Sequence, residues 1–400
     1  MGTPEFWMRV GRELGDDLAT DALDRDRAGK PPYDEVARLR DAGLPAALVP
    51  PDAVGGGMDW ADACAIVRRI AAADGSMGEL LGRHHVLSWS ARFFAAPERV
   101  TRLEARAVRE QWLWAGDTGT TGAAAPSRLG DDGTRLVLTP ASGGFLLNGE
   151  RTLATAVDVA DRLVLDAVCA TTGESLVVLA DPRRPGVGRT SLPDRFGQRL
   201  TGAGTVRFDD VPIGADDVLG SAARDEDAAV LFATVAPLAL RLMLAHVALG
   251  VAEGALAEAR DLSRAASHAR PRGSEQNLLA TPPDADLLLG FGELALAVHS
   301  ASAVVGRATA AMAETLRAGR ALDAERRADT AALVAAAEAV TVRAALLTGE
   351  GVLELADADG LDRFWRNIRV LAGRGPAGPT LRAIGDHFLH GEGALSARWM

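Results

Sequence analysis

The sequence is poor in lysine, cysteine and tyrosine, and these shortages limit the chemistry it can perform. Lys30 is its single lysine, so arginine supplies nearly all of the 43 basic side chains, which favours bidentate anion binding over lysine-based functions. Cys64 and Cys169 are its two cysteines, and they stand far apart in an apolar and a strand-like context. We therefore expect neither a disulfide framework nor a metal site built from thiolates.

Basic clusters and uninterrupted apolar runs are also missing. With a formal net charge of −11 and no basic run, the chain is not expected to bind nucleic acid. Arg241 and His246 interrupt the longest apolar run, residues 238–249, which is shorter than the roughly 18 residues of a membrane span. The opening MGTPEF, before a second methionine at Met8, resembles a cloning remnant and not a signal peptide. We expect a soluble cytoplasmic protein, with an arginine bias typical of GC-rich bacterial genes.

Hydrophobic periodicity divides the chain into three parts. The composition, 48% hydrophobic and 24% charged, is that of a globular protein. Helical spacing up to about residue 112 gives way to short strand-like runs punctuated by Gly, Pro and Asp, and helical spacing returns from about residue 225. We predict a mainly helical α+β protein with a remnant at 1–7, a helical domain at 8–112, an antiparallel β-barrel or sandwich at 113–222 and a helical bundle at 223–400.

Within this plan, Ser76 and Glu79 have the spacing of a capping box, which predicts the start of a helix that carries the pair His84-His85. The bundle helices are predicted at 225–268, 284–318, 323–356, 360–372 and 380–392.

Five motifs occur along this plan: Pro50-Pro51-Asp52-Ala53-Val54-Gly55-Gly56, Ala73-Asp74-Gly75-Ser76, Gly144-Phe145-Leu146-Leu147-Asn148-Gly149-Glu150-Arg151-Thr152, Phe196-Gly197-Gln198-Arg199-Leu200-Thr201-Gly202-Ala203-Gly204-Thr205 and Trp365-Arg366-Asn367-Ile368-Arg369. These motifs, in this order, resemble those of the acyl-CoA dehydrogenase superfamily. The fourth motif is most similar to that of the dibenzothiophene-monooxygenase branch of the superfamily. The resemblance implies an N-terminal helical domain, a middle β-barrel and a C-terminal bundle, assembled as a homotetramer or homodimer.

The resemblance also implies a flavin, FMN or FAD, between the barrel and the bundle. Leu153, Ala154 and Thr155 would lie along its ring, with the Thr155 hydroxyl near the reactive edge. A second set of implied flavin contacts comprises Thr118, Thr120, Thr121 and Gly122 at the pyrimidine edge, and Arg270 and Arg272 at the phosphates from a neighbouring subunit. Read without the resemblance, the threonine-rich loop is a cluster of β-turns and the two arginines belong to a solvated linker.

A carboxylate base for acyl-thioester dehydrogenation is missing where the superfamily places one. Removing a proton next to a thioester carbonyl requires such a base. The superfamily's base position after the last long helix aligns with Gly375, and no acid occurs from 363 to 385. The alternative base position near Leu240 and Arg241 also has no acid from 228 to 252. The sequence thus favours a monooxygenase over a dehydrogenase or oxidase. Glu253 remains as a candidate for a relocated base that would still allow dehydrogenation.

A flavin monooxygenase instead needs a dry pocket with hydrogen-bond donors near the bound oxygen. The resemblance places a histidine of the His84-His85 helix there, and because neighbouring helical residues diverge by about 100°, only one of the two is expected to face the flavin. Arg374 and Gly375 replace the His and Asp of the branch's C-terminal loop, so sulfur oxidation is in doubt. Arg374 is interpreted either as a clamp for an anionic or carrier-bound substrate or as a helix cap.

The last helix and the missing nucleotide motif complete the predictions. His387 and His390 share a helix face but lack further ligands, so no metal site is expected, and His387 is a weak candidate for contact with the flavin. No GxGxxG motif follows a strand, which predicts a separate flavin reductase that supplies reduced flavin by diffusion. Two alternatives stay open: a thioester dehydrogenase or oxidase with a relocated base, and a non-catalytic relative that uses the scaffold for binding.

Overall fold

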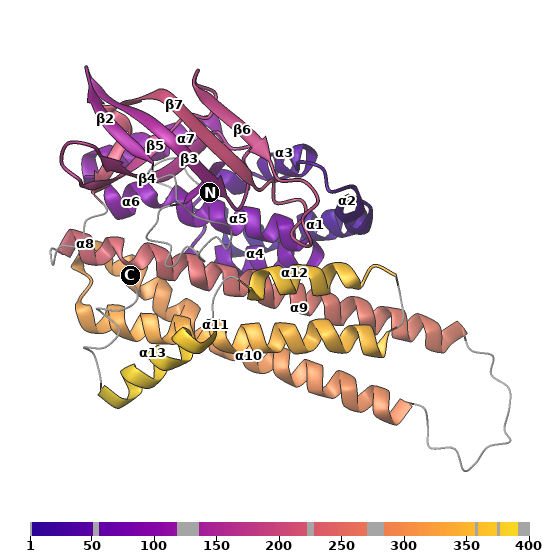
Figure 1. Cartoon of the computed structure of the whole chain (residues 1–400). Helices are drawn as coiled ribbons and strands as arrows, with labels where there is room; N and C mark the ends of the chain where they lie inside the picture. Colours follow the sequence, from indigo (N-terminus) through magenta and orange to yellow (C-terminus); the bar gives the residue numbers. More distant parts are fainter. Residues whose placement is uncertain are drawn as a thin grey trace, which may run out of the picture.

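The computed structural model describes residues 2–50, 56–117, 136–221, 228–269, 284–356, 359–373 and 377–390. A block of helices, a curved sheet and a second block of helices follow one another along the chain, as the sequence predicts (Figure 1). The sheet and the N-terminal helices lie on one side of the long helix α9, whereas α10, α11 and α13 lie on the other side (Figure 1).

The N-terminal block begins with a helix that Thr3 caps. Its helices are α1 (Pro4–Thr20), α2 (Ala22–Ala28), α3 (Tyr33–Asp41), α4 (Trp60–Ala73), α5 (Gly75–Ser88), α6 (Ser90–Phe94) and α7 (Pro97–Glu110), with a 3-10 turn at Leu44–Ala46. The Thr3 hydroxyl accepts a hydrogen bond from the Phe6 amide, and the buried Trp7 donates its indole N–H to the Gly56 carbonyl. Residues 4–7 are therefore part of α1, and the predicted boundary at residue 8 falls inside this helix.

The predicted start of α5 is correct to within one residue, but its cap differs. Asp74, not Ser76, accepts hydrogen bonds from the amides of Ser76 and Met77. The Ser76 hydroxyl instead accepts from the Leu200 amide at 3.3 Å. Because Asp74 caps the helix, the Ser76 hydroxyl is available to join α5 to the distant loop that contains Leu200.

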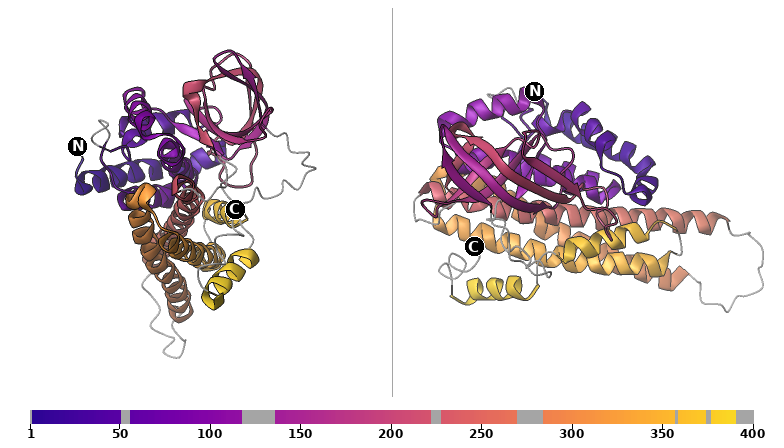
Figure 2. Two further views of the ribbon diagram at one scale, coloured as in Figure 1. Left: turned by 90° about the vertical axis from the view of Figure 1, so that its left-hand side faces the viewer. Right: turned by 45° about the horizontal axis from the view of Figure 1, so that its top comes forward.

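The middle segment forms one eight-stranded sheet that curls into a ring when viewed end-on (Figure 2). Its strands are β1 (Trp114–Asp117), β2 (Val137–Ala141), β3 (Gly144–Leu153), β4 (Arg162–Cys169), β5 (Ser175–Ala180), β6 (Val187–Ser191), β7 (Gly204–Gly214) and β8 (Val218–Ser221), with a 3-10 turn at Ala215–Asp217. The order is β6-β7-β3-β2-β4-β5-β8, with β1 beside β4. The expectation of a purely antiparallel sheet is wrong, because β1 and β2 both pair with β4 in parallel.

The C-terminal block matches the predicted helices closely. It contains α8 (Ala228–Ala233), α9 (Val235–Ala269), α10 (Asp284–Ala318), α11 (Ala324–Leu355), α12 (Asp362–Ala372) and α13 (Ala377–His390), with a 3-10 turn at Gly319–Ala321. Long helices rich in Ala and Leu can pack their axes closely, and α9 is buried between α4 and α5 on one side and α11 on the other.

Three of these helices are long and apolar enough to cross a membrane by length and composition alone, although charged residues interrupt them: Leu231–Ala265, Ala285–Ala321 and Ala324–Leu355. The first has 89% of its most apolar window buried inside the protein, which accounts for its composition. The other two windows are only 22% and 44% buried, so α10 and α11 expose apolar surface. Leu288, Leu289 and Leu296 of α10 are all more than half exposed.

Candidate active site

Three of the five sequence motifs meet at one junction between the sheet domain and the bundle. The loop after β6 contacts α12, where the Gln198 amide donates to Oδ1 of Asn367 at 2.6 Å and Arg366 donates to the Phe196 carbonyl at 3.2 Å. The same loop reaches the start of α5 through the bond from the Leu200 amide to Ser76. Segments about 120 and 170 residues apart are thus joined by hydrogen bonds.

Close backbone approach explains one glycine of this loop. A Cβ atom on Gly197 would lie 2.4 Å from the carbonyl oxygen of Arg366, so any larger residue would force the loop away from α12. Gly197 therefore has a packing role that its motif alone does not reveal.

The end of β3 belongs to the same hydrogen-bonded network. The amides of Ala156 and Val157 donate to the carbonyls of Thr201 and Gly202, at 2.7 and 2.8 Å. Ala156 has φ 61° and Gln198 has φ 54°, a left-handed conformation that costs free energy for residues with a Cβ. Strained residues of this kind cluster at binding and catalytic sites, and here two of them lie in one junction.

Two polar side chains are buried in this junction, and that of Gln198 has unused hydrogen-bonding groups among the described residues. Gln198 is fully buried, and within the described chain neither atom of its side-chain amide has a partner. Thr155, immediately before the strained Ala156, is also buried. Because a buried polar group without a partner is costly, the amide groups of Gln198 are suited to meet a ligand. Leu153 is buried at the end of β3 and Ala154 is partly buried, beside Thr155.

The structure distinguishes the two histidines of α5. Nε2 of His84 lies 2.9 Å from the Pro45 carbonyl, and Nδ1 accepts from the Trp114 amide at 3.0 Å. His84 is thus held by two backbone groups, which favours a structural role, and its catalytic role stays a prediction. His85 is equally buried, yet neither of its ring nitrogens has a hydrogen-bond partner among the described residues.

Burial keeps both imidazoles neutral. Desolvation lowers the pKa of His84 to about 4, although the hydrogen bond to Pro45 acts in the opposite direction. Desolvation, with a smaller contribution from His84, also lowers the pKa of His85 well below its ordinary value. Near neutral pH, His85 therefore offers one N–H donor and one acceptor nitrogen.

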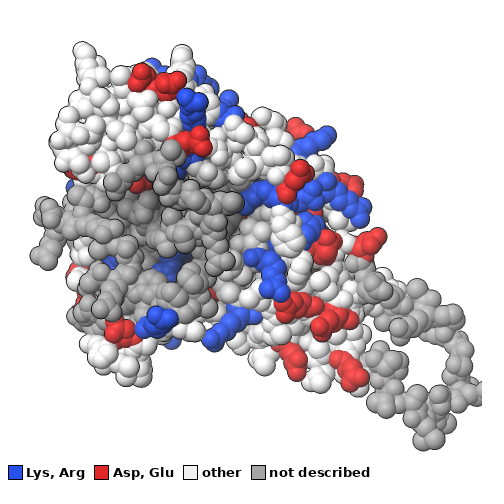
Figure 3. Space-filling model, in the orientation of Figure 1, with Lys and Arg blue, Asp and Glu red and all other residues white. Residues whose placement is uncertain are grey.

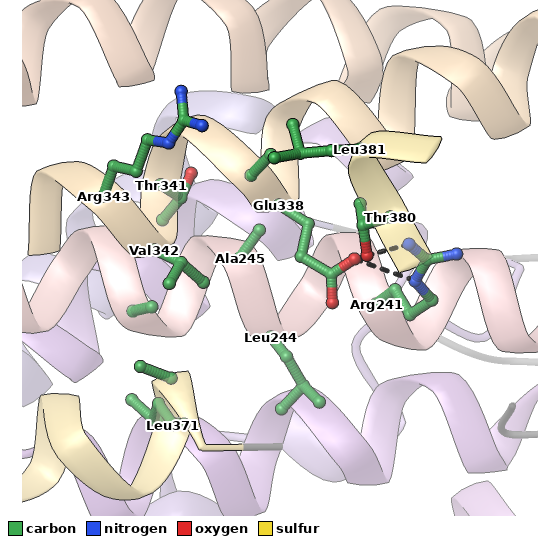
Figure 4. A pocket seen from close by; sticks show the side chains of 13 residues that line it. Arg241, Leu244, Ala245, Glu338, Thr341, Val342, Arg343, Leu371, Thr380 and Leu381 are labelled. Carbon is green, nitrogen blue, oxygen red and sulfur yellow. Dashed lines mark hydrogen bonds and ion pairs between the residues drawn. The ribbon is translucent and has the colours of Figure 1, made fainter. Parts of the chain in front are cut away.

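A pocket opens beyond the end of α12, between α9, α11, α12 and α13. Its cavity of about 90 Å³ has walls formed by Arg241, Leu244, Ala245, Ala248, Glu338, Ala339, Thr341, Val342, Arg343, Leu371, Ala372, Thr380 and Leu381. Figure 4 shows the Arg241 and Glu338 side chains directed toward each other, with Thr380 beside them. Nε of Arg241 donates to Oε2 of Glu338 at 3.1 Å, and Nη2 donates to the same oxygen.

The carboxylates near the predicted base positions are engaged in ion pairs. Glu253 receives two hydrogen bonds from Arg68 of α4, so it is not positioned as a free base. Glu338 lies in the pocket and faces Arg241. Arg241 is at one of the two positions where the superfamily places a carboxylate base and this sequence has none. Sequence reasoning missed Glu338 because it lies on α11, nearly a hundred residues away, and no local pattern connects it to α9.

The remaining site predictions lie apart from the junction or outside the described residues. Nε2 of His387 is 3.9 Å from a carboxylate oxygen of Asp329 on α11, whereas His390 pairs with Asp386 on its own helix. Among the described residues, no three His, Cys, Asp or Glu side chains form a group that would hold a metal ion. The predicted contacts that lie outside the described residues are Thr118, Thr120, Thr121, Gly122, Arg270, Arg272 and Arg374.

Comparison with known proteins gives the family. Residues 5–102 match the N-terminal domain of acyl-CoA dehydrogenases and residues 242–373 match their C-terminal domain. Dibenzothiophene monooxygenase from Rhodococcus erythropolis is 31% identical over 96% of this chain and 93% of its own length. The chain belongs to the acyl-CoA dehydrogenase superfamily.

Within this superfamily, the chain is a flavin-dependent oxidoreductase, and its relatives favour a flavin-dependent monooxygenase over an acyl-CoA dehydrogenase. A probable FMNH2-dependent monooxygenase from Pseudomonas putida, SfnC, is 28% identical over 97% of this chain and 95% of its own length. The structure of the dibenzothiophene monooxygenase TdsC from Paenibacillus sp. A11-2 with FMN and indole has a TM-score of 0.85 and 28% identity, and the match covers 96% of each chain.

Proposed function

We propose that this monooxygenase uses reduced FMN and O2 to oxygenate a small organic substrate at sulfur, nitrogen or carbon. The observation that carries the proposal is the strained junction at Ala156 and Gln198, which leaves the side-chain amide of Gln198 unpaired in the protein interior among the described residues. FMN is preferred to FAD because relatives that match the whole chain are named as FMNH2-dependent or carry FMN in their structures.

The residues at the end of β3 fit one side of a flavin ring. Leu153 and Ala154 would pack against the ring, the Thr155 hydroxyl would lie near its edge, and the side-chain amide of Gln198 supplies hydrogen-bonding groups that nothing else in the described chain uses. When bound and reduced, the flavin supplies the electrons that activate O2.

His85 is the candidate for orienting the reacting oxygen. Its neutral ring donates one hydrogen bond without acting as an acid near pH 7, because burial lowers its pKa. The helix around it is buried and so excludes bulk water, which would otherwise consume the activated oxygen unproductively. His84 supports this arrangement by fixing α5 to Pro45 and to β1.

A separate flavin reductase completes the reaction, because the sequence has no nucleotide-binding GxGxxG motif after a strand. Reduced flavin diffuses from one protein to the other. The protein acts in the bacterial cytoplasm, with no nucleic-acid or membrane partner. On the face in Figure 3, basic and acidic side chains are interspersed wherever grey atoms do not cover them, so that face offers no continuous basic surface.

Further copies of the chain cover the exposed apolar face of α10, giving a homotetramer or homodimer. The support is the exposure of Leu288, Leu289 and Leu296, together with a helix whose most apolar window is only 22% buried. Glu293 and Arg307 lie within this helix, so a polypeptide surface suits it better than lipid does.

Isotope labelling tests the proposed reaction. The full chain is supplied with FMN, NADH, a flavin reductase behind a dialysis membrane and ¹⁸O2, and a panel of thiophene, indole and dibenzothiophene compounds is analysed by mass spectrometry. We expect one ¹⁸O atom in the product, formed although the two proteins cannot touch. Desaturation of an acyl thioester, with no label incorporated into any compound, would instead support the dehydrogenase alternative.

A further inference from the structure

The pocket between α9, α11, α12 and α13 has an excess of positive charge. Among the described residues that line it, Arg241 and Arg343 stand against the single carboxylate of Glu338. Arg241 and Glu338 are held together inside the pocket, with side chains only 20% and 27% exposed. Arg343 is exposed and makes no ion pair with the described residues. One positive charge therefore remains uncompensated among the lining residues.

The rest of the pocket wall is mostly apolar. Leu244, Ala245 and Ala248 of α9 line the cavity together with Leu371 of α12, and Figure 4 places Arg343 at the edge away from Arg241. A wall of this kind suits an organic group that carries an anion at one end. Its volume of about 90 Å³ is smaller than the roughly 150 Å³ cavity that holds one benzene molecule, so the enclosed part of a ligand is a small ring or a short chain.

The pocket lies next to the junction assigned to the flavin. Asn367, which holds Gln198, and Leu371, which lines the pocket, are four residues apart on α12, or about 6 Å along the helix axis. A ligand in the pocket is therefore within one helical turn of the residues that contact the loop after β6.

We propose that this pocket binds a small anionic substrate, such as a carboxylate on a five-membered heterocycle, with Arg343 recognising the anion and Glu338 limiting its affinity. The assignment of the pocket to the substrate rests on the proposed function. Guanidinium groups bind carboxylates through two parallel hydrogen bonds, which gives both charge and geometric selectivity. Glu338 repels the same anion, and its ion pair with Arg241 leaves Arg343 as the charge that the anion can neutralise.

Binding of two isosteric probes to the full chain tests the proposal. Thiophene-2-carboxylate and thiophene-2-carboxamide have nearly the same shape and differ in charge, and isothermal titration calorimetry gives both dissociation constants. We expect the carboxylate to bind at least tenfold more tightly. Arg343→Gln should weaken the carboxylate about tenfold and leave the amide unchanged, whereas Glu338→Gln should strengthen the carboxylate severalfold. Arg326→Gln, an exposed arginine about 26 Å away along α11, is the matched control and should change neither.

Equal affinity for the two probes, no binding of either, or an unchanged carboxylate affinity in Arg343→Gln would overturn the proposal. A titration at saturating FMN separates a substrate site from a site for the flavin phosphate: retained carboxylate binding supports the former, and competition contradicts it. These titrations need no turnover. If the protein fails to change the oxidation of reduced FMN, the proposed function fails, while the preference for anions is judged independently from the titrations.

Discussion

At the scale of single residues, the neighbouring histidines of α5 show how position on a helix decides a role. His84 and His85 are equally buried, yet the first bonds two backbone groups and the second bonds none among the described residues. The sequence predicts that only one of the two faces the site, because they diverge by about 100°. It could not tell which one, since the partners of His84 come from Pro45 and Trp114, both distant in sequence.

Replacement of His84 should affect stability. His84→Ala leaves the Pro45 carbonyl and the Trp114 amide without their partner and opens a cavity, so we expect the free energy of unfolding to fall by about 3 kcal/mol. Urea denaturation measures this loss. A His84→Ala protein as stable as the wild type would contradict the structural role.

Replacement of His85 should affect turnover instead. His85→Phe fills a similar volume and removes two unpaired buried nitrogens, so stability should change by less than about 1 kcal/mol. Product formation per flavin oxidised should fall at least tenfold, because the hydrogen-bond donor is lost. Measuring product and hydrogen peroxide together tests the prediction, since uncoupled flavin oxidation should yield peroxide. Normal coupling in His85→Phe would remove His85 from the mechanism.

At the scale of elements, the helices were predictable and the contacts between them were not. The bundle helices lie within a few residues of their predicted bounds because their apolar periodicity is local. The parallel pairs that β4 makes with β1 and β2 depend on strands distant in sequence, so alternation within each strand could not reveal them. The motif at 196–205 was visible in the sequence, but its attachment to α12 was not.

That attachment can be tested at Gly197. A Cβ atom there meets the Arg366 carbonyl, so Gly197→Ala should separate the loop from α12 and weaken FMN binding about tenfold or more. Quenching of FMN fluorescence measures the affinity. Gly188→Ala, on β6 with only a 3.9 Å contact at its added Cβ, is a matched control that should bind FMN normally. Equal affinities in the two variants would contradict the role of the junction.

The exposed apolar face of α10 allows the predicted oligomer to be tested. Leu289→Glu with Leu296→Glu places charges where we expect another copy to pack, so the oligomer should dissociate into smaller species. Light scattering coupled to size-exclusion chromatography gives the masses. Leu192→Glu, on an exposed leucine beside the sheet, should leave the mass unchanged. A monomeric wild-type protein, or an unchanged mass in the double variant, would contradict coverage by further copies.

At the scale of the whole molecule, three buried histidines couple stability to pH. Desolvation lowers the pKa of His84 to about 4 and of His246 to about 3, and lowers that of His85 well below 6.5. Below pH 6.5 the unfolded chain binds protons that the folded chain does not, so this stability is complete above pH 6.5 and is lost as the pH falls. From pH 7.5 to 5.5 the three groups together should remove about 4 kcal/mol.

Denaturation at several pH values tests this coupling. His246→Gln can keep a hydrogen bond to Thr309 and removes one titrating group, so its loss between pH 7.5 and 5.5 should be about one third smaller. An identical pH dependence in the wild type and this variant would show that His246 is not buried in its neutral form.

The order of helical, sheet and helical segments, the bounds of the helices and the flavin chemistry were all accessible from the sequence. The pocket was not, because Arg241, Glu338, Arg343 and Leu371 come from three helices and adjoin only after folding. The start of α5 also shows that a local pattern can mislead, because the spacing of Ser76 and Glu79 suggested Ser76 as the cap and the cap is Asp74. Local periodicity is thus readable, whereas long-range partners require the fold.

Rapid mixing tests the central claim most directly. The protein is loaded anaerobically with reduced FMN and mixed with oxygenated buffer in a stopped-flow spectrometer, with free FMN and the His85→Phe variant alongside. The account predicts that oxidised FMN appears in the presence of the protein with kinetics clearly distinct from free flavin, including a delay that His85→Phe shortens. Oxidation at the rate of free flavin, with reduced FMN and reduced FAD alike, would contradict it.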